Sequence, residues 1–209
     1  VTGGAIALNG LAGVVPAEWA KVIYGMGFSL VAGFFLGWLF VKVIEKACTH
    51  VNRQAANHAF TGIQDVCAVA LSFLHGAQDG QKFIGVLFLG LAFSNGQDSV
   101  TGISIPVWLM LLCSVIMGAG TSVGGEKIIK SVGMDMVKLE KYQGFSADLS
   151  AAFCLLYSSL FGIPVSTTHT KTAAIMGVGA VRRLSAINLG VVKDMVLTWI
   201  FTFPGCGLI

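Results

Sequence analysis

Residues 162–170 read Gly-Ile-Pro-Val-Ser-Thr-Thr-His-Thr, a polar run inside a strongly apolar chain. Pro164 has no N–H and predicts the end of an incoming helix. The hydroxyl side chains that follow are typical of the start of an outgoing helix. Non-helical backbone at membrane depth survives only where it is buried in protein or lines a polar cavity. The run therefore predicts the tip of a helical hairpin inside a membrane domain.

The composition also indicates a membrane protein. Hydrophobic residues make up 55% of the chain and charged residues 11%, whereas soluble domains average about 45–50% and 25%. The 27 glycines among 209 residues suit closely packed transmembrane helices. A soluble protein with a large buried core would need many more charges on its surface. A net charge of +3 is too small to indicate nucleic-acid binding.

Apolar segments of about 20 residues, the length that crosses the hydrocarbon core, predict the helices. We expect them at 19–43, 60–94 with an interruption, 106–123, 145–163 followed by 172–181, and from 187 onward. The first segment carries small residues at four-residue spacing, which predicts a helix-packing face. These residues are Gly25, Ser29, Gly33 and Gly37.

Basic residues cluster in three stretches, 42–53, 127–141 and 182–193. The positive-inside rule places these stretches in the cytoplasm, so 127–143 is predicted to be a cytoplasmic connecting loop, and the 95–105 loop is predicted to lie outside. The limb after the polar tip has only about ten apolar residues, or roughly 15 Å of helix. That length reaches about half of the core, so we expect a re-entrant hairpin rather than two spans.

The second interruption is His75-Gly76-Ala77-Gln78-Asp79-Gly80-Gln81-Lys82. Glycines on both sides of Asp79 favour unwound backbone whose carbonyls can hold an ion. An ionised carboxylate at the bilayer centre costs about 2.5–3.5 kcal/mol on insertion scales, so Asp79 needs a bound cation or Lys82 as a partner. We therefore expect a broken helix with a functional Asp79. The alternative is an intact helix in which Asp79 and Lys82, three residues apart, only neutralise each other.

The tip offers two kinds of chemistry through Ser166, Thr167 and Thr168. Free N–H groups at a helix N-terminus attract an anion, while hydroxyl oxygens can equally coordinate a cation such as Na⁺. The alternative is that these hydroxyls only bond back to helix carbonyls. His169 is expected to act as a structural donor, with a proton relay or a substrate contact as the other roles.

Together the two motifs resemble the inorganic phosphate transporter (PiT) family. The matching text is 75–82 and Pro164-Val165-Ser166-Thr167-Thr168-His169, with further likeness at 144–148, 177–180 and 184–186. The resemblance runs from about Val15 to the end, in the order of the family's C-terminal half. It implies an all-α membrane protein, a transmembrane helix bundle with a broken helix and a re-entrant hairpin. Residues 1–209 would be a single domain, the second repeat of an inverted-repeat transporter.

The resemblance implies symport of inorganic phosphate with Na⁺ or H⁺ across the plasma (inner) membrane by a multi-pass protein that is not an enzyme and needs no cofactor. The implied substrate-binding residues are Gln78, Asp79, Lys82, Ser166, Thr167 and Thr168, and the implied cation ligands are Asp79, Thr167 and Thr168. The family has Asn where this chain has Gln78, a departure that leaves room for a different substrate preference. Lys82 could supply positive charge toward the anion. The expected partners are phosphate, the lipid bilayer and the missing N-terminal half, and a homodimer is compatible with the sequence.

Three other functions stay open. A sulfate or other oxyanion transporter would need the same site, and a purely structural membrane subunit would explain the helices but not the polar interruptions. An intramembrane hydrolase would use Ser166 and His169, although Ser166 is not in a Gly-x-Ser-x-Gly motif. Residues 124–127 lack the Gly-Lys-Ser/Thr of a phosphate-binding P-loop. The five cysteines include no Cys-x-x-Cys pair, so no metal site is indicated.

Overall fold

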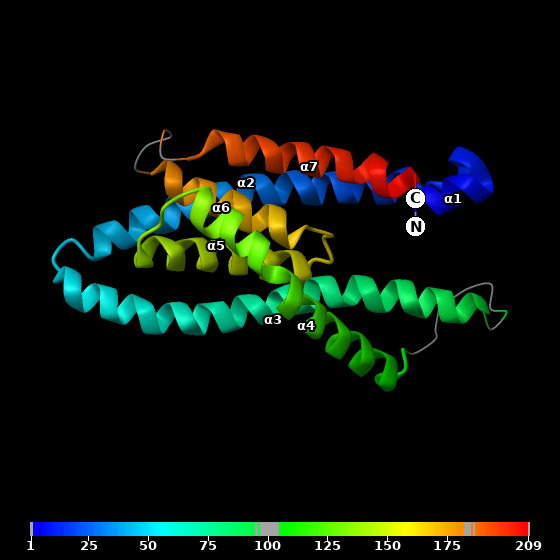
Figure 1. Ribbon diagram of the computed structural model, residues 1–209, viewed down its shortest axis with the longest axis horizontal. Coiled ribbons are helices and arrows are strands. Elements are labelled where there is room, and N and C mark those ends of the chain that lie inside the picture. Colours follow the sequence, from blue (N-terminus) through cyan, green and yellow to red (C-terminus); the bar gives the residue numbers. More distant parts are fainter. Residues whose placement is uncertain (1, 95, 97–104, 182–184, 186, 209) are drawn as a thin grey trace.

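The computed structural model describes residues 2–94, 96, 105–181, 185 and 187–208, and every regular element among them is helical. Figure 1 shows the α5–α6 pair lying between α2 and α3. The predicted all-α architecture is confirmed. The elements in chain order are α1 (Thr2–Asn9), a 3₁₀ turn (Gly10–Gly13), α2 (Pro16–Ala47), α3 (Arg53–Ser94), α4 (Val107–Lys130), a π-helical turn (Ser131–Asp135), α5 (Lys141–Leu160), α6 (Thr167–Ala180) and α7 (Leu189–Leu208).

Three helices of the described part are long and apolar enough to cross a membrane: α2, the Val107–Gly125 part of α4, and α7. Many of their large apolar side chains, such as Phe35, Trp108 and Phe201, are exposed. In a soluble protein such a surface would be unstable, but it suits lipid or a neighbouring protein. The chain is therefore a multi-pass membrane protein. The predicted sidedness stays a prediction, and most of the 95–105 loop and the Arg182–Arg183 pair lie outside the described residues.

The predicted break near residues 76–82 is wrong, because α3 is one continuous helix of 42 residues. Helix interiors tolerate glycine at a cost of about 1 kcal/mol each relative to alanine. An unwound segment would instead leave several backbone N–H and C=O groups unpaired. In the intact helix Asp79 forms an ion pair with Lys82, with 2.9 Å between Asp79 Oδ1 and Lys82 Nζ. Asp79 Oδ2 also lies 3.4 Å from His75 Nε2. The Lys82 ammonium neutralises part of the charge on the carboxylate without any unwinding.

The predicted hairpin is confirmed as a pair of packed helices, α5 and α6, while its re-entrant course through a membrane stays a prediction. The incoming helix ends earlier than expected, at Leu160, rather than at Pro164. Gly162 follows with φ +62°, and the Ile163 N–H donates to the Ser158 carbonyl at 2.9 Å. This is a Schellman ending, in which a glycine just past the helix adopts the left-handed conformation.

The row of small residues on α2 packs against α6, and it lets the backbones of the two helices come close together. Its members Gly25, Ser29, Gly33 and Gly37 are all buried. A Cβ placed on Gly33 would lie 2.9 Å from the Thr170 carbonyl oxygen, and one on Gly37 would collide with the Ala174 carbonyl. On the facing helix, a Cβ on Gly177 would collide with the Phe34 carbonyl. Glycine is therefore required on both sides of this crossing.

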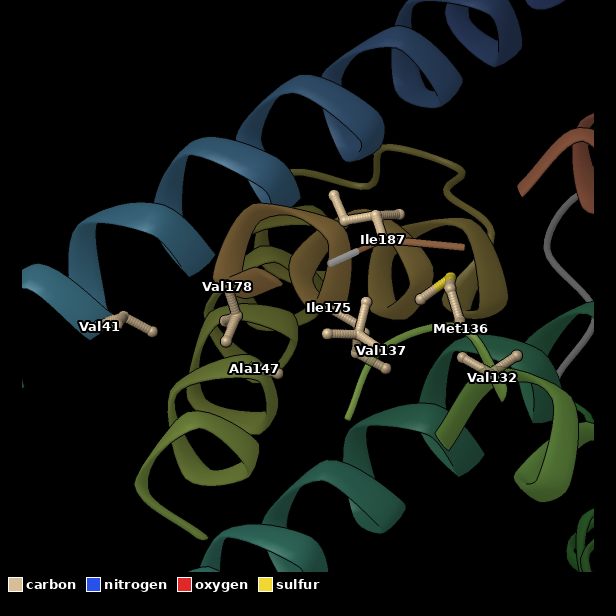
Figure 2. Close-up of a cluster of buried hydrophobic side chains, with 8 residues drawn as sticks. All are labelled: Val41, Val132, Met136, Val137, Ala147, Ile175, Val178 and Ile187. Atoms are coloured by element: carbon tan, nitrogen blue, oxygen red, sulfur yellow. The ribbon is translucent and has the colours of Figure 1, made fainter. Parts of the chain in front are cut away.

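A cluster of buried hydrophobic side chains lies where the connection after α4 packs against the hairpin (Figure 2). Its buried members are Val41, Val132, Met136, Val137, Ala147, Ile175, Val178 and Ile187. The 127–143 segment is thus more ordered than a loop. It is helical to Lys130, turns once as a π-helix, and then inserts Met136 and Val137 into this cluster. Its cytoplasmic location stays a prediction.

Candidate functional site

The two polar motifs meet at Asp79. Its Oδ2 accepts a hydrogen bond from Thr167 Oγ1 at 3.1 Å, and its Oδ1 accepts one from Lys82 Nζ at 2.9 Å. The Asp79 side chain is only 21% exposed, and Thr167 is buried. Residues 88 positions apart in the sequence therefore form one contact between the middle of α3 and the first turn of α6.

Lys82 joins the same contact from the other side. Its ammonium also donates to the Val165 carbonyl at 3.0 Å, in the short connection before α6. Lys82 thus ties the carboxylate and the hairpin tip together. In this arrangement its positive charge is directed at Asp79 and the tip.

Gln78 attaches α3 to α5. Its side chain is buried, and its amide donates to Ser159 Oγ at 2.9 Å and weakly to the Leu155 carbonyl at 3.5 Å. Both acceptors belong to the incoming limb of the hairpin. These contacts support a packing role for Gln78, next to the carboxylate but directed away from it.

Ser166 is the N-cap of α6, as the sequence predicted. Its Oγ accepts from the His169 backbone N–H at 3.4 Å, and its carbonyl accepts from Thr170 Oγ1 at 2.9 Å. The Thr167 and Thr168 N–H groups belong to the first turn, where a helix supplies no carbonyl partner. The first turn of α6 thus combines N–H donors, two threonine hydroxyls and the positive end of the helix dipole.

A cavity of about 930 Å³ lies between α3, α4 and α6 and reaches this first turn. Thr167 and Thr168 line it, whereas Gln78, Asp79, Lys82 and Ser166 are not among its lining residues. Among the described residues that line it, Lys171 is the one lysine or arginine, and none of them is a carboxylate. Its polar lining otherwise consists of Gln81, His75 and the hydroxyls of Ser72, Ser114, Thr121, Ser122, Thr167, Thr168 and Thr172.

The ion pair between Lys171 on α6 and Asp148 on α5 is the part of the site that the sequence did not predict. In the sequence Asp148 belongs to the 144–148 motif, and neither Asp148 nor Lys171 is among the predicted site residues. The available signal was spacing: Lys171 follows Thr168 by three residues and Thr167 by four, which places all three on one face of a helix. The pairing itself depends on how the two limbs are aligned, which the sequence alone does not give.

His169 faces α7 and not the cavity. Its ring packs on Trp199 with ring centroids 4.0 Å apart, and it is absent from the cavity lining. Ser166 Oγ accepts a hydrogen bond from the backbone N–H of His169, whereas the His169 ring contacts Trp199 and not Ser166. The buried Nδ1 of His169 has no hydrogen-bond partner within the described structure, so the geometry favours a packing role for the ring and does not support the expected role as a donor. A Ser–His pair for hydrolysis is not formed among the described residues.

Comparisons with known proteins identify the family of this chain. Residues 45–209 match the model of the phosphate transporter family. The chain is 35% identical over 204 residues to "Probable low-affinity inorganic phosphate transporter" of Bacillus subtilis, covering 98% of this chain and 61% of that protein. It is 34% identical over 209 residues to a protein of the same name from Rhizobium meliloti, covering all of this chain and 62% of that protein.

The fold is also found in a solved structure, "The sodium-dependent phosphate transporter", with a TM-score of 0.86 at 22% identity. That likeness covers 99% of this chain and 68% of the solved chain, and at this identity it shows a shared fold. The chain thus spans about three-fifths of the length of the two curated relatives. The family match covers most of the sequence, including both polar motifs. The chain belongs to the phosphate transporter family.

Proposed function

We propose that this protein carries inorganic phosphate across the plasma membrane by symport with Na⁺ or H⁺. The observation that carries the proposal is the 3.1 Å contact between Asp79 and Thr167 at the first turn of α6, beside the cavity. A helix N-terminus with neutral hydroxyl donors suits an oxyanion. A carboxylate touching the same turn suits a cation.

Coupling follows from the closeness of these two groups. Phosphate held at the first turn of α6 is repelled by the Asp79 carboxylate, and the repulsion is strong where water is excluded. A cation bound between Asp79 and the Thr167 and Thr168 oxygens cancels that repulsion. Phosphate therefore binds well only with the cation, which is the condition for symport. Lys82 already neutralises part of the charge, so one cation is sufficient in this scheme.

The rest of the transport cycle needs a second structural unit. The curated relatives are longer than this chain, and inverted-repeat transporters hold substrate at the interface of two repeats. We propose that these residues form one repeat and that the other completes the substrate site. Rocking of one repeat against the other would then expose the site to each side of the membrane in turn.

Uptake of radiolabelled phosphate into proteoliposomes with the full-length protein tests the proposal. We expect uptake driven by an inward Na⁺ gradient, or by a proton gradient that an uncoupler abolishes. Folded protein that takes up no phosphate under either gradient would contradict it. Competition by sulfate in the same assay separates a phosphate transporter from a general oxyanion transporter. If sulfate inhibits uptake at the same concentration as unlabelled phosphate does, the protein is better described as a general oxyanion transporter.

A further inference from the structure

We propose that Lys171, together with Thr168 and Thr172, forms a second oxyanion position in the cavity, one helical turn from the tip of the hairpin. The inference rests on the proposed function, because it takes phosphate to be the ligand. In this scheme the anion passes along one face of α6 between the Lys171 ammonium and the first turn, and Asp148 holds the ammonium in place.

The first argument is placement. Thr168, Lys171 and Thr172 all line the cavity between α3, α4 and α6, and their spacing puts them on one face of α6. Lys171 follows Thr168 by three residues, a rise of about 4.5 Å along the helix. A phosphate ion is small enough to move between the two positions without leaving the cavity.

The second argument is charge. Among the described residues that line the cavity, Lys171 is the one lysine or arginine, and none of them is a carboxylate. The Lys171 side chain is 33% exposed, whereas its partner Asp148 is 11% exposed and does not line the cavity. An ammonium has three hydrogen-bond donors. Lys171 can therefore keep Asp148 while it donates to a phosphate oxygen, and no buried carboxylate is left unpaired.

Lys82, the cation that the sequence suggested for the anion, is less well placed. It is 48% exposed, but it donates to Asp79 and to the Val165 carbonyl, and it does not line the cavity. Its charge is used to hold Asp79 and the tip. The cation that faces the cavity is Lys171.

The third argument is an unpaired hydroxyl. Thr172 is 1% exposed, and within the described structure its Oγ1 has no hydrogen-bond partner. A buried hydroxyl without a partner is costly and calls for a missing ligand or water. Thr172 follows Lys171 directly and contacts the same cavity. Its Oγ1 is itself covered in this structure. A rotation of the Thr172 side chain about χ1 would bring the hydroxyl to the cavity, where a phosphate oxygen beside the ammonium would supply its partner.

The first test measures the KM of phosphate uptake in proteoliposomes with the full-length protein, under a saturating cation gradient. Lys171→Met should raise KM by about 10-fold or more, because a charge-assisted contact is lost, while Lys171→Arg should stay close to wild type. Lys21→Met is the matched control, since Lys21 is exposed and paired only with Glu18. It should leave KM unchanged.

A purely structural ion pair is excluded by the double variant Lys171→Met/Asp148→Asn. If Lys171 only neutralises Asp148, removing both charges restores both the thermal midpoint and KM. If Lys171 also binds the anion, the midpoint recovers but KM stays high. A double variant with the wild-type KM would overturn the inference. The proposed function is tested separately, by uptake in the wild type and in Asp79→Asn. If the wild type takes up phosphate and Asp79→Asn does not, the proposed function stands even when the inference about Lys171 fails.

A second test compares two buried hydroxyls that both lack partners. Thr172 lines the cavity and Ser158 on α5 does not. Thr172→Val should keep or raise the thermal midpoint, because an unpaired polar group is removed, yet it should raise the KM for phosphate. Ser158→Ala should change neither binding nor uptake. A wild-type KM in Thr172→Val would overturn the placement of the anion beside this residue.

Discussion

Asp79 is held by three side chains from two helices, and this explains how a carboxylate persists in the middle of an apolar bundle. Lys82 and His75 approach it along α3, and Thr167 approaches it from α6. Removing one partner of a buried ion pair leaves the other charge uncompensated, and this loss of stability exceeds what the intact pair contributes. The network therefore fixes Asp79 against the first turn of α6, where both proposed ligands would meet.

The Thr167 hydroxyl is the most direct link between the two motifs. Thr167→Val keeps the shape of the side chain but removes the 3.1 Å donor to Asp79. We expect the affinity for the coupled ligands to fall by roughly 1–3 kcal/mol, the usual cost of a lost buried partner. Phosphate binding to purified protein at fixed cation concentration measures the change. Thr202→Val on α7, where the hydroxyl bonds only to its own helix, should bind phosphate like the wild type.

At this scale the sequence predicted the residues better than their partners. The spacing of Asp79 and Lys82 gave an ion pair as the alternative to a broken helix, and the ion pair is present. The hydroxyls after Pro164 predicted a helix start, and Ser166 is the N-cap. The Lys171–Asp148 pair could not be predicted, because it depends on the alignment of two helices rather than on spacing within one.

At the scale of the element, α3 differs most from the expectation. Glycine favours unwinding only if the freed backbone finds other partners. A sequence does not state whether such partners exist. In the structure the helix satisfies its own backbone, and Gly76 and Gly80 line the cavity instead. Glycine here leaves open space beside the carboxylate rather than breaking the helix.

The double variant Gly76→Ala/Gly80→Ala tests whether α3 stays helical during transport. A Cβ at either position meets no atom within 4 Å. Each alanine should therefore add about 1 kcal/mol of helix stability, and uptake should continue at a rate close to that of the wild type. Circular dichroism melting and phosphate uptake measure the two effects. Raised stability with abolished uptake would show that unwinding at this position is part of the cycle.

The crossing of α2 and α6 depends on glycine at both helices. A Cβ on Gly177 would collide with the Phe34 carbonyl, which belongs to backbone and cannot rotate away. Gly177→Ala should therefore separate the helices and destabilise the protein by about 1–3 kcal/mol, as overpacking does. The thermal midpoint of detergent-purified protein measures the loss. Gly90→Ala on α3, where the added Cβ meets nothing, should be neutral or stabilising.

For the whole molecule, the helical class, the spans at α2, α4 and α7, and the α5–α6 hairpin were all predictable. Apolar length and the Pro-Val-Ser-Thr-Thr run at 164–168 are local signals that tertiary packing rarely overrides. The cavity was not predictable, since it depends on how α3, α4 and α6 pack against one another, which spacing within one helix does not give. Its single lining cation among the described residues could be identified only after those helices were placed.

The central claim is that a cation at Asp79 permits phosphate to bind at the first turn of α6. Binding of radiolabelled phosphate to the purified full-length protein, with and without the coupling cation, tests it in wild type and in Asp79→Asn. Because coupling between two ligands is reciprocal, the cation must raise phosphate affinity in the wild type. We predict that Asp79→Asn stays folded and binds phosphate with the same affinity whether or not the cation is present. An Asp79→Asn variant that keeps the wild-type dependence on the cation would contradict the account.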